Sequence, residues 1–175
     1  LFVWMGEILF RTKLSENLFE GLSPWMQKLP GGLVHVNVVG CALFAAISGS
    51  SAATVATVGK MSIPELRKRK YPEKILLGSL AGSGTLGLLI PPSIILIIYG
   101  VTVQESIAKL FIAGIIPGIM IALIFMSYVI IWSLINKKSM PQYVENFTFF
   151  EKIKKSKQLL PVIILISAVI GSIYT

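Results

Sequence analysis

Residues 47–54 have the sequence ISGSSAAT and interrupt an otherwise apolar segment that covers residues 31–59. Glycine and small hydroxyl residues are weak helix formers and bury little apolar surface. Within a bilayer every backbone amide and carbonyl needs a partner, so irregular backbone occurs only where protein or a water-filled cavity covers it. The segment therefore predicts either one long span or two short legs that enter a membrane and return, with the break at the tip.

The composition is typical of an integral membrane protein. Of the 175 residues, 54% are hydrophobic and 14% are charged, with a mean hydropathy of +0.79. Soluble domains carry about 25% charged residues, so this chain is too apolar for that class. Sixteen Lys and Arg face eight acidic residues, giving a net charge of +8. In a membrane protein such an excess marks cytoplasmic loops, and we expect no nucleic-acid partner.

Apolar blocks alternate with basic ones along the chain. Residue 1 is Leu and the last 17 residues are an apolar run, so we expect an internal piece of a longer membrane protein. The stretch 11–30 has apolar residues at helical spacing and predicts an amphipathic arm helix, either packed on neighbours or lying at the membrane surface with Trp25 at the interface. The predicted segments are the end of a truncated span (1–10), the arm helix (11–30), a re-entrant hairpin (31–59), a cytoplasmic basic loop (60–74), a broken transmembrane helix (75–101), a transmembrane helix (110–135), a second cytoplasmic basic loop (136–158) and the start of a truncated span (159–175).

The charges predict which segments share a side of the membrane. Residues 60–74 and 136–158 each hold six basic residues, whereas 102–109 holds only Lys109. Two crossings separate the basic stretches, so both lie on one side, which the positive-inside rule makes the cytoplasm. The weakly basic stretch 11–30 favours the same side, and hence favours a hairpin over a single span for the segment between.

A second break follows about 40 residues after the first, in GTLGLLIPPS (84–93). Two adjacent prolines remove backbone donors and clash with the preceding turn, so they should part the helix. Broken helices near the middle of the bilayer are typical of secondary transporters, which bind substrate and ions at the break. The alternative for both breaks is a packing role for small residues and a structural kink.

The residue types at the two breaks indicate what could bind there. Hydroxyl and carbonyl oxygens suit a hard cation, whereas helix amides suit an anion. Residues 31–59 and 75–101 contain no Asp or Glu, so no carboxylate is available there for a proton relay. This favours Na⁺ held by neutral oxygens. The residue patterns of intramembrane aspartyl and serine proteases are absent, and we expect no enzyme activity and no cofactor besides a coupling ion.

Three stretches together resemble one transporter family. They are GCALFAAISGSSAATVATVGK (40–60), PELRKRKYPEKILLGSLAGSGTLGLLIPPSIILIIYG (64–100) and SIAKLFIAGIIPGIMIALIFM (106–126). In order and spacing they are similar to the large membrane subunit of TRAP (tripartite ATP-independent periplasmic) transporters. The resemblance implies an all-α integral membrane protein of elevator type, with a re-entrant helical hairpin and a discontinuous transmembrane helix. It also implies a Na⁺-coupled importer of organic acids in the bacterial inner membrane, with a small membrane subunit and a periplasmic substrate-binding protein as partners.

The resemblance places a Na⁺ and substrate site where hairpin tip and broken helix meet. Its predicted residues are Ser48, Gly49, Ser50, Ser51, Thr54, Thr85, Gly87, Pro91, Pro92 and Ser93, with Ser48, Ser50, Ser51, Gly87 and Pro92 as candidate Na⁺ ligands. Two alternatives stay open at this point. One is a membrane scaffold or assembly subunit without a transport site, and the other is an elevator transporter of a neighbouring carboxylate family.

Overall fold

The computed structural model describes residues 14–141 and 149–174, and every regular element in those ranges is helical. The span end predicted for residues 1–10 lies outside the described residues. In chain order the elements are α2 (Leu14–Met26), α3 (Val34–Ser48), α4 (Ser51–Lys68), α5 (Glu73–Gly84), η1 (Thr85–Leu88), α6 (Ile94–Val103), α7 (Ile107–Ile135), η2 (Lys137–Ser139), α8 (Phe149–Ser156), η3 (Lys157–Leu159) and α9 (Leu160–Tyr174).

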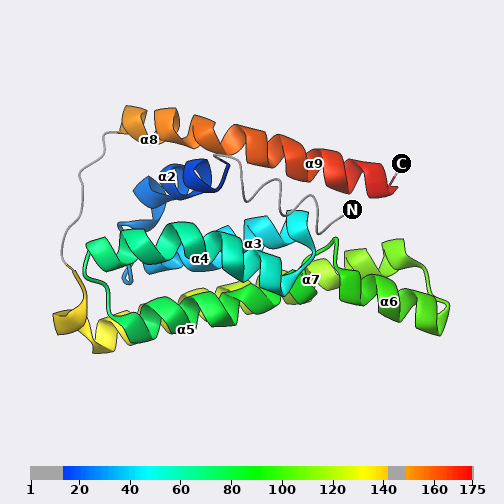
Figure 1. The fold of residues 1–175 in the computed structure, drawn as a ribbon, viewed down its shortest axis with the longest axis horizontal. Coiled ribbons are helices and arrows are strands. Elements are labelled where there is room, and N and C mark those ends of the chain that lie inside the picture. The colour runs from blue at the N-terminus through cyan, green and yellow to red at the C-terminus, as the bar shows by residue number, and fades with distance from the viewer. Residues whose placement is uncertain (1–13, 142–148, 175) are drawn as a thin grey trace.

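Helices α3 and α4 form an antiparallel hairpin, so residues 34–68 fold as two legs and not as one continuous helix. A Cβ built on Gly40 of α3 would lie 3.6 Å from Val58 and 3.9 Å from Met61 of α4, so the two legs run side by side. Only Gly49 and Ser50 separate them. Figure 1 shows the hairpin turning back beside the join between α5 and α6, while α7 continues past it.

Helix α7 is the one helix in the described ranges that is long and apolar enough to cross a membrane. It has 29 residues, and at 1.5 Å per residue it is about 43 Å long. Its outer face exposes large apolar side chains, among them Ile116 (76% exposed), Leu123 (58%) and Ile131 (58%). Helices α3 and α6 are apolar but shorter, with 15 and 10 residues.

The hairpin lies between two groups of helices (Figure 1). On one side α2, α8 and α9 run together, and Trp25 Nε1 of α2 donates to Ser156 Oγ of α8 at 2.8 Å. A core of buried side chains, including Leu18, Phe44 and Val162, joins this group to α3. On the other side α3 packs against α5 and α7 through Val34, Val38, Ile75 and Val129.

The basic stretch 60–74 is largely helical, so the prediction of a loop over its whole length is wrong. Helix α4 continues to Lys68 because Lys, Arg, Leu and Glu are good helix formers, and Arg69 Nε pairs with Glu65 one turn earlier at 2.8 Å. The helix then ends in a Schellman motif. Lys70 has φ +60°, and the Tyr71 amide donates to Leu66 O at 3.0 Å.

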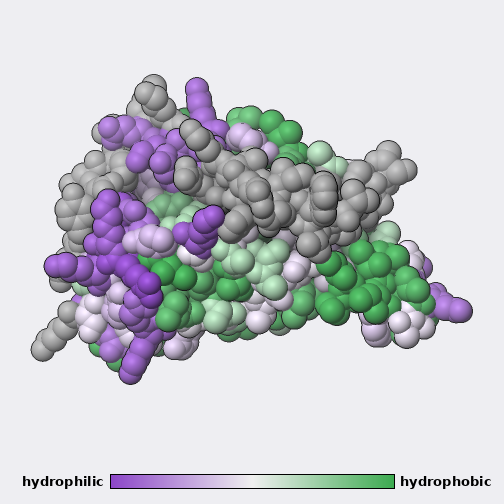
Figure 2. Space-filling view, in the orientation of Figure 1, coloured by the Kyte–Doolittle hydropathy of each residue, from purple (hydrophilic) through white to green (hydrophobic). Residues whose placement is uncertain are grey.

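The other predicted segments correspond to helices with shifted limits. The arm is helical over α2, the span predicted for 110–135 begins at Ile107, and the basic stretch 136–158 includes helix α8. The end of α7 and the α4–α5 connection border one cavity, so the two basic stretches lie at the same end of the molecule. Figure 2 shows hydrophilic residues gathered at this end.

Candidate functional site

The hairpin tip is a two-residue turn with a cap on each side. Gly49 has φ +59° and its amide donates to Ala45 O at 3.1 Å, which closes α3 with a left-handed residue that glycine adopts without steric cost. Ser50 is extended, with φ −135° and ψ +125°, and its hydroxyl accepts from the Ala53 amide at 3.5 Å. The ISGSSAAT sequence thus supplies both the end of one helix and the start of the next.

Three residues of the tip form a compact group of oxygen atoms. Ser48 Oγ and Thr54 Oγ1 lie 2.8 Å apart, and both side chains are fully buried. Thr54 Oγ1 also donates to Ser50 O at 2.7 Å. The end of α3 and the first turn of α4 therefore place two hydroxyls and one carbonyl within hydrogen-bonding distance of each other.

The helix break at Pro91-Pro92 has the same kind of construction. Helix α5 tightens into η1, which ends at Leu88, and α6 begins only at Ile94. Ser93 caps α6, because its hydroxyl accepts from the Leu96 amide at 3.5 Å and donates to Leu88 O at 2.6 Å. Pro91, Pro92 and Ser93 are all buried. The break predicted from the double proline is present, and Ser93 bridges its two sides.

The tip and the break touch through their backbones. The Ile94 amide donates to Gly49 O at 3.4 Å. A Cβ added to Gly49 would lie 2.5 Å from Pro92 O, and one added to Gly87 would lie 2.8 Å from Ser51 N. Two glycines therefore permit an approach that any side chain would block.

Nine of the ten predicted site residues belong to this contact or to the buried groups on either side of it. Thr85 differs, because its side chain is exposed and its hydroxyl donates to Gly82 O at 2.7 Å within its own helix turn. Its oxygen is directed to its own backbone, and the structure does not place it in the buried group.

The atoms at this contact that could coordinate an ion are uncharged hydroxyl and carbonyl oxygens. Such oxygens suit a hard cation. Across the described residues, no group of three or more His, Cys, Asp or Glu side chains is placed to hold a metal ion. The hydroxyls of Ser48, Ser50 and Thr54 already have internal partners. A hydroxyl that donates its hydrogen keeps acceptor lone pairs, so these partners do not exhaust the oxygens.

Sequence reasoning missed a buried polar group that joins the hairpin to the broken helix. Asn37 Nδ2 of α3 donates to Ser79 Oγ at 3.0 Å and to Leu76 O at 3.2 Å, both on α5. Ser83, one turn further along α5, donates to Ser79 O at 2.6 Å. The signal was present as serines spaced four apart in an apolar segment, which places them on one helix face.

Comparison with known proteins gives a match over the full chain. Residues 1–175 match the family model described as tripartite ATP-independent periplasmic transporter, DctM component. The chain belongs to this family. Its members are the large membrane permeases of TRAP transporters, so the resemblance seen in the three sequence stretches is confirmed and a neighbouring carboxylate transporter family is ruled out.

Three relatives illustrate the range of the DctM family. A C4-dicarboxylate TRAP transporter large permease from Pseudomonas aeruginosa is 34% identical over 174 residues, which are 99% of this chain and 40% of that protein. An isethionate TRAP transporter permease from Oleidesulfovibrio alaskensis is 34% identical over 178 residues, 99% of this chain and 28% of its own length. A sialic acid TRAP transporter permease from Haemophilus influenzae is 39% identical over 126 residues, 72% of this chain and 20% of its own length. The chain therefore spans well under half the length of these relatives.

Proposed function

We propose that this chain forms the first-repeat part of a secondary active, Na⁺-coupled importer of organic acids. In this proposal Ser48, Ser50 and Ser51 at the hairpin tip, with Gly87 and Pro92 at the break, supply oxygens to Na⁺. Thr54 and Ser93 support that group from either side. Substrate would bind beside the ion, where the rest of the permease completes the cavity.

The observation that carries the proposal is the backbone contact between tip and break. Two irregular segments, 49–50 and 89–93, meet inside a membrane permease, and the Ile94 amide donates to Gly49 O. Irregular backbone at membrane depth is found where it is covered by protein or lines a site. In secondary transporters such unwound segments coordinate coupling ions through carbonyls.

The dimensions of the hairpin support re-entry from one side. Helix α3 has 15 residues and is about 22 Å long, which is short of the ~30 Å hydrocarbon core. Both legs return to the end of the molecule (Figure 1) where hydrophilic residues gather (Figure 2). With that end in the cytoplasm, the tip reaches the interior of a bacterial inner membrane, and the protein crosses it several times.

The names of the relatives and of the family support the proposed substrate class and partners. Their names specify C4-dicarboxylate, isethionate and sialic acid, and each of these is an organic acid. The family description contains the words tripartite and periplasmic. This supports a small membrane subunit and a periplasmic substrate-binding protein as partners.

The test uses the full-length permease with its partners in proteoliposomes. Replacing Ser50 and Ser51 by Leu should abolish Na⁺-dependent uptake, while membrane insertion and the amount of protein stay unchanged. Ser127→Ala is the control, since Ser127 is exposed and its hydroxyl donates to Leu123 O of its own helix at 2.8 Å. Unchanged uptake by the double variant at saturating Na⁺ would refute the site.

A scaffold or assembly subunit is the second candidate, and one observation favours it. The hydroxyls of Ser48, Ser50, Thr54 and Ser93 all serve as caps or bond one another, so close packing alone could explain their presence. Cysteine accessibility separates the two functions. In a full-length permease from which Cys41 and any other cysteine have been removed, an aqueous thiol reagent should label Ser50→Cys and Na⁺ should protect it, whereas a scaffold predicts neither result.

A further inference from the structure

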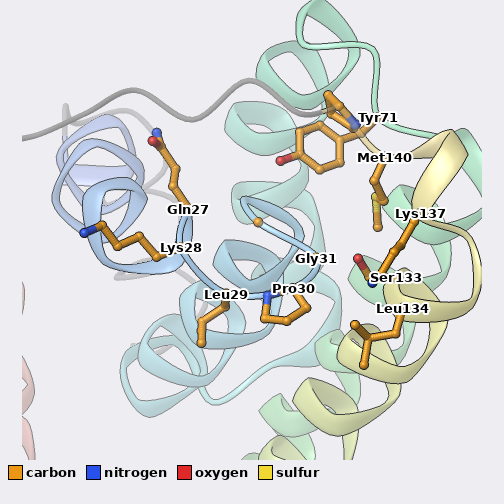
Figure 3. A pocket seen from close by; sticks show the side chains of 12 residues that line it. Gln27, Lys28, Leu29, Pro30, Gly31, Tyr71, Ser133, Leu134, Lys137 and Met140 are labelled. Carbon is orange, nitrogen blue, oxygen red and sulfur yellow. The ribbon is translucent and has the colours of Figure 1, made fainter.

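A cavity of about 410 Å³ lies at the base of the hairpin, far along α3 from the tip (Figure 3). One wall is the turn from Gln27 to Gly32 that joins α2 to α3, and Tyr71 of the α4–α5 connection forms another. The third wall is the end of α7 with Ser133 and Leu134, together with Lys137 of η2. The cavity is thus built from three segments that are distant in sequence.

The polar groups of the cavity suit an anion. Lys137 of η2 lies beside the end of α7 (Figure 3), and the exposed Lys28 lies at the rim on the α2 side. A lysine side chain is long and flexible enough to turn into such a cavity. None of the described residues that line it is a carboxylate. Two ammonium groups without an opposing acid make a site that favours negative charge.

Tyr71 adds a hydrogen-bond donor to the two cations. Its hydroxyl oxygen accepts from the Leu33 amide at 3.1 Å, which leaves the phenolic hydrogen available for another partner. Burial raises the pKa of the Tyr71 phenol, so the group keeps that hydrogen at neutral pH.

The position of the cavity indicates a ligand that is polar at one end and apolar at the other. Lys137 lies two residues after Ile135, the last residue of the long apolar helix α7. Leu29, Leu134 and Met140 also line the cavity, and Leu134 is 48% exposed. The cavity therefore lies at the boundary between the apolar surface of α7 and the basic end of the molecule, which is the depth of lipid headgroups. Basic pockets between helices on the cytoplasmic side bind such headgroups.

We propose that this cavity binds the phosphate of an anionic phospholipid headgroup, held by Lys137 and Lys28 and by a hydrogen bond from Tyr71. The glycerol and first acyl carbons would lie on Leu134 and Met140. The bound lipid would connect the arm helix α2 to the end of α7 beside the turn at Gly31 and Gly32. The observations behind this proposal do not involve the Na⁺ site, because they concern the opposite end of the hairpin.

The experiment measures lipid binding by the full-length permease, purified in dodecyl maltoside and depleted of lipid. Thermal unfolding midpoints are recorded with added phosphatidylglycerol, phosphatidylcholine or glycerol 3-phosphate, and retained lipid is counted by mass spectrometry. Three variants are compared with the unaltered protein. Lys28→Gln with Lys137→Gln removes the charges, Leu134→Trp fills the cavity and keeps them, and Lys109→Gln removes the same charge type near the opposite end of α7.

Phosphatidylglycerol should raise the midpoint more than phosphatidylcholine in the unaltered protein and in Lys109→Gln. The charge-removal and cavity-filling variants should each lose at least half of that difference and retain less phosphatidylglycerol. Glycerol 3-phosphate giving the full rise by itself would assign the cavity to soluble phosphates and overturn the lipid. Equal rises with both lipids, or equal losses in Lys109→Gln, would overturn the site. Lys28 and Lys137 are exposed, so their replacement leaves folding intact.

Discussion

Gly87→Ala tests the contact between tip and break most directly. A Cβ at this position would lie 2.8 Å from Ser51 N, 2.9 Å from Ser50 C and 2.9 Å from Ser51 Cα. All three are backbone atoms, so no side chain can rotate away, and the tip must separate from the break. Inserting atoms into a closely packed contact costs about 1–3 kcal/mol.

The substitution therefore destabilises the conformation in which the hairpin tip contacts the helix break. If Na⁺ binds only this arrangement, its apparent affinity should fall by about 5- to 150-fold, which is the same free energy expressed as a ratio. The assay is Na⁺-dependent uptake by the full-length permease in proteoliposomes, with the Na⁺ concentration varied at fixed substrate. Maximal uptake at high Na⁺ should be largely recovered, because the ion can restore the contact by mass action.

Gly78→Ala is the matched control for this experiment. Gly78 lies in the interior of α5, is exposed, and has no atom within 4 Å of an added Cβ. Alanine there improves helix propensity by up to about 1 kcal/mol and should leave Na⁺ dependence unchanged. A Gly87→Ala variant whose half-saturating Na⁺ concentration stays within twofold of the unaltered value would refute the reasoning.

Three further predictions concern stability and are checked by thermal unfolding of the purified permease. Ser62→Ala should raise stability by roughly 1 kcal/mol, because the Ser62 hydroxyl is buried and has no hydrogen-bond partner among the described residues. Tyr71→Phe should lower it by about 1–3 kcal/mol by leaving a buried backbone amide unpaired, whereas Tyr99→Phe, at an exposed ring, should have no effect. The hydrogen bond from Arg67 lowers the pKa of Glu73, so this pair stabilises the fold above the ordinary carboxyl pKa and loses its effect as pH falls through the lowered value. Arg67→Gln should therefore flatten the acid side of the unfolding profile, and an unchanged profile would contradict the assignment.

Local chemistry made the two breaks predictable. Gly49 and the serines around it are the residue types that end one helix and start another, and Pro91-Pro92 cannot continue a helix. The family resemblance predicted that the two breaks lie close together, and in the structure they are in backbone contact. The ion and substrate roles of these residues stay predictions.

Other features depend on long-range partners that a sequence pattern does not contain. The bond from Asn37 to Ser79 joins residues 42 positions apart, and the bond from Leu33 to Tyr71 joins residues 38 apart. The run of charges up to Lys68 predicted a loop because charge was taken as the signal. The helix propensity of these residues and the ion pair between Glu65 and Arg69 instead continue α4 to Lys68.

The bond between Tyr71 and Leu33 closes the hairpin at its base, and the bond between Ile94 and Gly49 holds it at its tip. Helix α3 connects these two points as a rod about 22 Å long, stiff along its axis. A displacement of one end along this axis should therefore move the other end by a similar amount. What binds at the tip and what fills the cavity at the base would then act on the same rigid body, and occupancy of one could be measured through the affinity of the other.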